Sequence, residues 1–146
     1  ALDTCGFAPW PTLRDAAAHA DLVLYDLKLM DDDRHTSATG VSNRVILENL
    51  QALTAIHANI WIRIPVIPGV NDDDDNLCAT AAFLRPLPGI TRVDLLPYHP
   101  NGEAKFARVG QTYALHGTLT PSAARLESLA AHVRATGLTT TIGGHA

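Results

Sequence analysis

Apolar residues fall along this chain in short runs, separated by longer segments in which they recur every three or four positions. Five short runs are predicted as buried strands, most of them from their β-branched and aromatic content. They are residues 2–4, 22–27, 60–67, 92–99 and 138–142. The third run is apolar at both odd and even positions apart from Arg63, which is typical of a parallel strand covered on both faces. Pro65 predicts that its ladder weakens or ends there.

Helices are predicted between the runs at 11–19, 42–58, 71–84 and 120–137, with a single helical turn within 31–40 and a surface loop at 101–117. We expect caps at Ser42, Asn71 and Thr120, and carboxyl ends at Gly40 and Gly137. Strands that alternate with helices predict an α/β fold with a parallel sheet and right-handed crossovers, either open or part of a barrel.

Composition narrows the class of protein. The chain has 146 residues, 47% hydrophobic and 18% charged, which predicts one globular domain over residues 1–146. Its net charge of -4 provides no basic surface for nucleic acid or an anionic membrane. No run reaches transmembrane length, so a cytoplasmic protein is expected. Cys5 and Cys78 lack metal-ligand spacing and are predicted to be free thiols.

The acidic run at residues 72–75 invites a calcium interpretation. Its spacing does not match an EF-hand loop, which needs alternate ligands and a distant glutamate. Acidic residues in the first turn of a helix explain the run better, because negative charge is favoured there. Nucleotide-binding loops of the Gly-x-Gly-x-x-Gly or Walker type are absent as well.

Polar side chains are predicted to gather at the carboxyl ends of the strands. Asp26 and Lys28 leave the same face of one strand because they are two residues apart. The carboxyl ends of parallel strands share one rim, where ligands bind in α/β proteins. The other rim residues are Asp3, Thr4, Arg63 and His99. In the structural alternative, Asp26 and Lys28 form an ion pair, Arg63 pairs with a neighbouring carboxylate, and His99 is a satisfied core histidine. Four strands that each contribute a polar group favour a ligand site instead.

Six segments carry a resemblance to a known family. They are LDTCG (2–6), LYDLKLM (24–30), GVSN (40–43), RIPVIPG (63–69), LLPYH (95–99) and GEAKF (102–106). In this order they span essentially the whole chain and resemble the carboxyl-terminal part of the glycyl-radical enzyme activating enzymes. These enzymes belong to the radical S-adenosylmethionine superfamily, and the pyruvate formate-lyase activating enzyme is one of them.

The resemblance implies a partial (β/α) barrel, related to the TIM barrel, that holds S-adenosylmethionine and a [4Fe-4S] cluster. The reduced cluster cleaves S-adenosylmethionine to methionine and a 5′-deoxyadenosyl radical, which takes a hydrogen atom from a glycine of a partner glycyl-radical enzyme. Flavodoxin or ferredoxin is the implied electron donor. The chemistry belongs to the cofactors, and the protein supplies position and electrostatics.

The resemblance also assigns roles to the rim residues, all six of which are expected to bind the cofactor. Lys28, Arg63 and His99 match groups that line the S-adenosylmethionine pocket. The remaining matches form a site for a monovalent cation, Na⁺ or K⁺, beside the cofactor's carboxylate; they are Asp3, Thr4, Asp26 and the carbonyl of Leu24.

The chain departs from the family in one large respect. The cluster motif C-x3-C-x2-C and the Gly-Gly-Glu segment that contacts the methionyl amine are absent. In the family both lie upstream of the matching segments, so a truncated protein that lacks the first, cluster-binding strands is expected. Cluster iron needs thiolate ligands that Cys5 and Cys78 cannot supply. This chain alone is therefore predicted to be inactive, with no catalytic residue of its own.

Two other functions remain open. An aldolase-like enzyme could form a Schiff base on Lys28, but this needs an uncharged amine, and Asp26 favours the charged form. A non-catalytic, degenerate barrel fragment would carry the rim residues as remnants. The motifs do not distinguish among glycyl-radical enzyme partners, and they do not report extra ferredoxin-like clusters.

Overall fold

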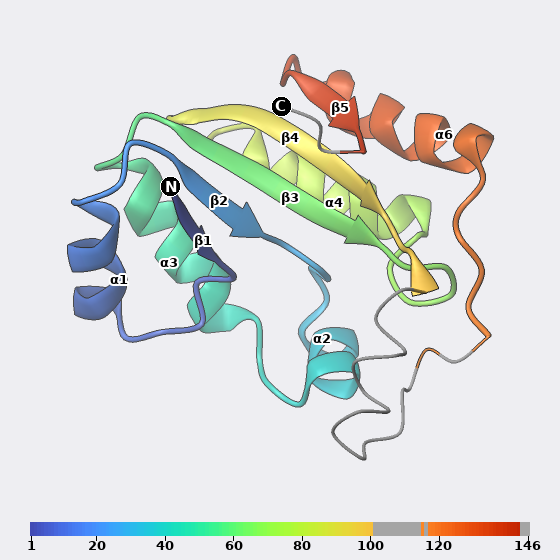
Figure 1. Cartoon of the computed structure of the whole chain (residues 1–146), viewed down its shortest axis with the longest axis horizontal. Coiled ribbons are helices and arrows are strands. Elements are labelled where there is room, and N and C mark those ends of the chain that lie inside the picture. Colours follow the sequence, from blue (N-terminus) through green and yellow to red (C-terminus); the bar gives the residue numbers. More distant parts are fainter. Residues whose placement is uncertain (101–114, 116, 144–146) are drawn as a thin grey trace.

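The computed structural model describes residues 1–100, 115 and 117–143. Its strands form one five-stranded sheet in the order β1-β2-β3-β4-β5. They are β1 (Leu2–Thr4), β2 (Val23–Asp26), β3 (Ile60–Val66), β4 (Ile90–Pro97) and β5 (Thr140–Ile142). Every neighbouring pair is parallel, as Figure 1 shows. The predicted α/β fold with parallel strands is confirmed.

The connecting helices are α1 (Trp10–Ala17), α2 (Asp32–Thr39), α3 (Arg44–Thr54), α4 (Asp74–Leu84) and α6 (Ala123–Arg134). When strand order follows chain order, right-handed crossovers place the connecting helices on one face of the sheet. Figure 1 shows α3 and α4 behind the strands, with α2 beyond the arrowhead of β2. Within the described residues the opposite face, here called the open face, carries no helix.

Burial along β3 alternates with the period of a strand that is covered on one face. Its buried positions are Ile60, Ile62, Ile64 and Val66. Trp61, Arg63 and Pro65 between them are only partly buried. The expectation of cover on both faces is therefore wrong for the described residues, because the helices all lie on one side. Pro65 does not end the strand, since it lies in register with Leu96 of β4.

Tyr25 fastens α3 to the covered face of the sheet. Its hydroxyl donates to the carbonyl oxygen of Ile46 at 2.6 Å, and burial, with a smaller effect from Cys5, raises the pKa of this phenol. The ring also sets the turn after β1. A Cβ built on Gly6 would lie 1.6 Å from the Tyr25 hydroxyl oxygen, so glycine is required there for space as well as for its φ of 71°.

The amino ends of two helices differ from the prediction. α4 begins after Asp73, whose Oδ1 accepts from the Asn76 amide at 2.9 Å, whereas Asn71 is buried in the preceding loop. α6 begins after Ser122, whose hydroxyl accepts from the Arg125 amide at 3.2 Å, so Thr120 is not its cap. In both cases a residue two positions later has the extended backbone that a cap requires.

α2 and α3 also differ from expectation. α2 has eight residues, two turns rather than one, and ends at Gly40 with a φ of 81° as predicted. The amino cap of α3 is Asn43, whose side chain makes no capping hydrogen bond. Ser42, the predicted cap, lies one residue earlier, where its hydroxyl donates to Asp32 at 2.7 Å and accepts from the Arg44 amide at 3.2 Å. α3 ends at Thr54, four residues before the predicted end.

Some expectations fall outside the described part of the chain. The loop at 101–117 lies mostly there, together with the GEAKF segment at 102–106. Among the described helices, none combines the length and apolar content needed to span a bilayer. Cys5 and Cys78 are free thiols, as predicted.

Candidate functional site

Strands β1, β2 and β3 bring three of the rim residues into direct contact, with Asp26 at the carboxyl end of β2 and Arg63 in the middle of β3, not at its end as predicted. Arg63 Nε donates to Asp26 Oδ1 at 2.8 Å, and Arg63 Nη1 donates to Asp3 Oδ2 at 2.9 Å. Sheet register explains the geometry, since Asp26 lies beside Arg63 and Asp3 lies beside Leu24. Residues in register, or two apart on one strand, share a face. All three side chains therefore lie on the open face.

The two halves of this cluster differ in solvent exposure. The side chain of Arg63 is 20% exposed and that of Asp26 is 26% exposed, whereas that of Asp3 is 62% exposed. Partial burial disfavours the charged guanidinium, but the hydrogen bonds that Arg63 donates to Asp3 and Asp26 outweigh this effect, and the pKa of Arg63 is raised. Exposed ion pairs contribute about 0–1 kcal/mol. Asp3 is thus the more exposed of the two carboxylates that Arg63 binds.

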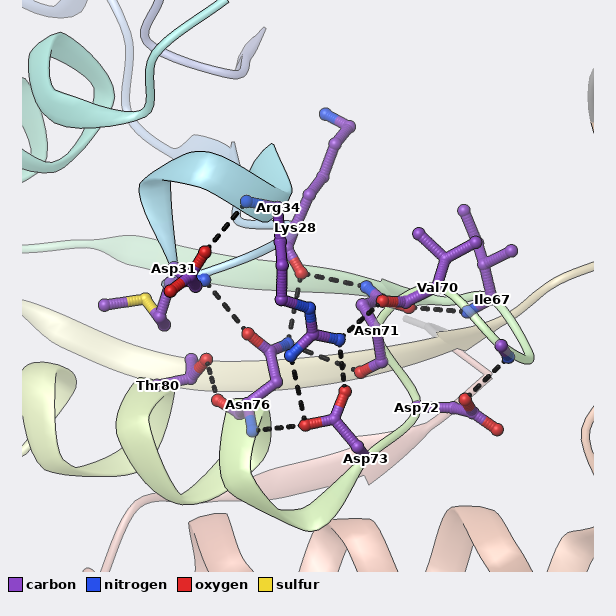
Figure 2. Close-up of polar contacts among 12 residues, drawn as sticks. Lys28, Asp31, Arg34, Ile67, Val70, Asn71, Asp72, Asp73, Asn76 and Thr80 are labelled. Atoms are coloured by element: carbon purple, nitrogen blue, oxygen red, sulfur yellow. Dashed lines mark hydrogen bonds and ion pairs between the residues drawn. The ribbon is translucent and has the colours of Figure 1, made fainter. Parts of the chain in front are cut away.

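Lys28 extends the cluster past the end of β2. Its Nζ lies 3.9 Å from Asp26 Oδ2, and its side chain is 36% exposed. Its backbone carbonyl accepts from Asn71 Nδ2 at 2.9 Å and from Asn76 Nδ2 at 3.2 Å. Figure 2 shows the Lys28 side chain extending away from the two asparagines. The backbone is thus held from one side, and the ammonium is presented on the other.

Asn71 is the centre of this support and is 1% exposed. Its side-chain nitrogen, Nδ2, also donates to the Pro65 carbonyl at 2.6 Å, and its Oδ1 accepts from the backbone amide of Ile67 at 2.8 Å. One side chain therefore joins the end of β2 to the loop after β3. Buried amides are stable only when their hydrogen bonds are made, so this geometry fixes both loops together.

A second layer of polar contacts surrounds that loop (Figure 2). Asn76 Oδ1 accepts from the Met30 amide at 2.9 Å. Arg34 of α2 donates to the Val70 carbonyl at 2.8 Å and to Asp73 Oδ2 at 2.5 Å. These contacts tie α2, the loop after β3 and the start of α4 into one support beneath Lys28.

The other predicted site residues are placed differently. Thr4 Oγ1 accepts from the Gly6 amide at 2.9 Å, so it shapes the turn after β1. Leu24 lies in register with Asp3 and so shares its face of the sheet. His99 is exposed two residues beyond β4, and within the described residues no hydrogen bond or ion pair joins it to Arg63 or Asp26. The structure thus assembles Asp3, Asp26, Lys28 and Arg63, and it leaves His99 apart.

Known proteins resemble this chain in sequence and structure. The trans-4-hydroxy-L-proline dehydratase activating enzyme of Clostridioides difficile is 44% identical over 146 residues, which are 99% of this chain and 48% of that protein. A crystal structure of a domain of the pyruvate-formate lyase-activating enzyme of Bacteroides vulgatus is 31% identical with a TM-score of 0.80, and the match covers 97% of this chain and 79% of that domain. The chain belongs to the family of glycyl-radical enzyme activating enzymes.

The match has a defined extent. The chain spans about half the length of the curated activating enzyme, 48%. A radical S-adenosylmethionine methyltransferase of Sphaerobacter thermophilus shares the fold, with a TM-score of 0.69 at 21% identity over 96% of this chain and 38% of that one. No protein-family profile matches the chain.

In this activating-enzyme chain, sequence reasoning missed the residues that support the site. Asn71 was assigned to a helix cap, and Asn76 was not singled out. The one available signal was Asn49, a polar residue within the apolar stripe of α3. It donates to the carbonyl oxygens of Gly6 and Ala8, both at 2.8 Å, and so holds the turn after β1.

A second polar cluster on the open face of this activating-enzyme chain was also missed. Arg92 Nε donates to Asp94 Oδ1 at 2.5 Å, and its guanidinium carbon lies 4.4 Å from the centre of the Trp61 ring. Thr141 donates to the same Asp94 oxygen. Arg92 and Asp94 are two residues apart, which is the same spacing that drew attention to Asp26 and Lys28. Attention to strand ends alone overlooked it.

Proposed function

We propose that this chain forms the S-adenosylmethionine-binding part of an activating enzyme that installs a glycyl radical on a partner enzyme. The observation that carries the proposal is the contact between Arg63, Asp26 and Asp3 on the open face of three neighbouring strands, in a chain that belongs to the activating-enzyme family. The trans-4-hydroxy-L-proline dehydratase activating enzyme supports a glycyl-radical enzyme as the partner.

The chemistry of the rim residues fits S-adenosylmethionine. Arg63 and Lys28 offer cationic donors for its carboxylate, and the exposed link to Asp3 lets Arg63 turn toward it. His99 would contribute at the edge of the pocket. Bound beside a reduced [4Fe-4S] cluster, S-adenosylmethionine supplies a 5′-deoxyadenosyl radical for hydrogen-atom removal from a glycine. The residues described here bind and orient it.

The carboxylates have a second role in this proposal. Asp3, Thr4, Asp26 and the Leu24 carbonyl would hold a monovalent cation once Arg63 has moved to the ligand carboxylate, because Arg63 otherwise bridges the two aspartates. Titration of S-adenosylmethionine in potassium or sodium chloride should then give tighter binding than in tetramethylammonium chloride. Equal affinities in all three salts would exclude the cation.

The chain does not fit the cluster. It has two cysteines, and three thiolates are needed in the family. Cys5 follows β1 at the rim, whereas Cys78 lies on α4 and is hydrogen-bonded to His132. The electron from flavodoxin or ferredoxin, and a cytoplasmic location, belong to the proposal for the complete protein.

Calorimetric titration of the chain with S-adenosylmethionine tests the binding role. Removing a charged hydrogen-bond partner costs roughly 1.5–3 kcal/mol, so Arg63→Ala should weaken binding about 10- to 100-fold. Arg63→Lys should fall between, because lysine keeps the charge but loses the planar fork. The matched control is Arg44→Ala on α3, where the side chain is 80% exposed and no loss is expected.

Two outcomes would overturn the proposal. One is a folded wild-type chain that does not bind S-adenosylmethionine, which would favour a non-catalytic barrel fragment. The other is binding that Arg63→Ala and Arg44→Ala weaken equally. In the Schiff-base alternative the reacting amine would be Lys28 Nζ, which lies 3.9 Å from an Asp26 oxygen. Borohydride trapping with a carbonyl ligand would favour that alternative.

A further inference from the structure

Away from the rim, the junction of α4 and α6 contains a chain of three side chains that the proposed function does not use. Cys78 Sγ lies 3.3 Å from His132 Nδ1, and His132 Nε2 lies 2.8 Å from Asp74 Oδ1. Asp74 and Cys78 are four residues apart on α4 and so share one side of that helix. His132 reaches them from the last turn of α6.

The hydrogen bonds assign the protons. Hydrogen bonds from His132 and Arg125 hold the pKa of Asp74 below its usual range. At neutral pH Asp74 is therefore an ionised carboxylate, which can accept hydrogen bonds but cannot donate them. His132 Nε2 must therefore carry a hydrogen and donate it. In the neutral imidazole this leaves Nδ1 as the acceptor, and Nδ1 is the atom that faces the Cys78 thiol.

This arrangement is not needed for packing. Leu77, Ala81, Leu129 and Ala130 on the same two helices are buried, whereas Cys78 is exposed. Arg125 already joins the helices through Asp74, at 3.1 Å, and through the Asp72 carbonyl, at 3.0 Å. The thiol is therefore accessible to solutes, and a base faces it.

We propose that Cys78 is a site of thiol–disulfide exchange with small disulfides, with His132 as its proton acceptor and Asp74 as the positioning residue for His132. The Cys78 sulfur gives its proton to His132 Nδ1 and attacks one sulfur of the disulfide. The bond between the two disulfide sulfurs breaks, a mixed disulfide forms on Cys78, and the second sulfur leaves as a thiolate that takes up a proton. One disulfide is consumed and one is formed, so no other oxidant is required.

The test uses the full chain with glutathione disulfide as the probe. Mass spectrometry of peptides follows mixed-disulfide formation at Cys78 and Cys5 over time, in native buffer and in urea. Native Cys78 should react about tenfold faster than the same cysteine in the denatured chain, because the thiolate is the attacking species. The substitution His132→Gln should remove most of the rate advantage of native Cys78 over denatured Cys78. The matched control, His19→Gln on the exposed surface after α1, should leave it unchanged.

The positioning role of Asp74 is tested by a measurement that does not respond to packing alone, the tautomer of His132. Nitrogen-15 shifts of the imidazole ring report the tautomer, and the wild-type chain should show His132 protonated at Nε2. Asp74→Asn should lose that preference and slow the exchange at Cys78. The proposal is overturned if native Cys78 reacts no faster than denatured Cys78, if His132→Gln matches His19→Gln, or if wild-type His132 carries its hydrogen on Nδ1. None of these readouts depends on S-adenosylmethionine binding.

Discussion

At the scale of single residues, the site depends on amides that carry no charge. Asn71 makes three hydrogen bonds to backbone atoms of Lys28, Pro65 and Ile67. It thereby positions the backbone from which Lys28 extends. The charged residues of the rim were visible as sequence patterns, but their placement depends on this buried side chain.

Asn71→Asp keeps the shape of the side chain and removes its donors. The new carboxylate would face the carbonyl oxygens of Lys28 and Pro65. The Lys28 carbonyl would keep its hydrogen bond from Asn76, whereas the Pro65 carbonyl would lose the donor of Asn71, and a buried group left unsatisfied, with a charge placed beside it, costs about 1–3 kcal/mol or more. We expect the free energy of unfolding in urea, followed by tryptophan fluorescence, to fall by about 2–4 kcal/mol.

Asn59→Asp is the matched control for that substitution. Asn59 Nδ2 donates to a single carbonyl, that of Asp21, at an exposed position and at 3.0 Å. Water can replace that hydrogen bond, so the loss should stay below about 1 kcal/mol. Similar losses for the two variants would contradict the supporting role assigned to Asn71.

At the scale of elements, the start of α4 is where two helices and one loop are tied together. The carboxylate of Asp73 caps α4 by accepting from the Asn76 amide, and it also accepts a hydrogen bond from Arg34 of α2. The hydrogen bond from Arg34 is the main reason that the pKa of Asp73 is lowered. The acidic run at 72–75 is therefore a helix start, with Asp72 accepting from the Gly69 amide at 2.8 Å.

Asp73→Ala should destabilise the chain by about 1 kcal/mol at neutral pH, the typical cost of a lost cap. Because the native pKa is lowered, the stabilisation is complete above the unfolded pKa of about 4. It is lost as the pH falls through the lowered native value. Urea unfolding of both chains at neutral pH and at about pH 3 measures the difference.

The wild-type advantage should shrink in acid. Thr39→Ala on the exposed end of α2 controls for helix substitutions in general, since the group it changes does not ionise in this range. An advantage of Asp73 that stays constant or grows on acidification would show that its charge does not contribute.

At the scale of the whole molecule, the sheet separates the proposed S-adenosylmethionine site from the proposed thiol site. The covered face packs against the helices, and the open face carries Arg63, Asp26 and Asp94. The thiol of Cys78 lies on a helix of the covered side, away from the rim. The proposed ligand surface therefore lacks the three thiolates that the cluster of this family needs.

Anaerobic reconstitution of the chain with iron and sulfide should yield no stable four-iron signal by absorbance and iron analysis. An activating enzyme of this family that contains C-x3-C-x2-C is the positive control, and it should retain the cluster. A stable four-iron cluster on this chain alone would show that the ligand assignment is wrong.

The sequence by itself determined most of the elements and placed the charged residues that the structure brings together. The apolar runs became β2, β3 and β4, and Gly40 ended α2 as predicted, because strand and helix periodicity depend on near neighbours in the chain. The prediction for Gly137 was wrong, since α6 ends at Arg134 with Ala135 as its carboxyl cap. The register of Asp26 and Lys28 also follows from a local spacing. The six family segments were sufficient to indicate the family.

Only the tertiary structure decided which groups meet. Arg63 joins Asp3 across sixty positions, and Asn71 reaches back forty-three positions to Lys28. These partners depend on sheet register and on helices that all pass on one side, and neither leaves a periodic trace in the sequence. For the same reason Asn71 was mistaken for a cap, β3 was expected to be covered twice, and the approach of His132 to Cys78 was not foreseen.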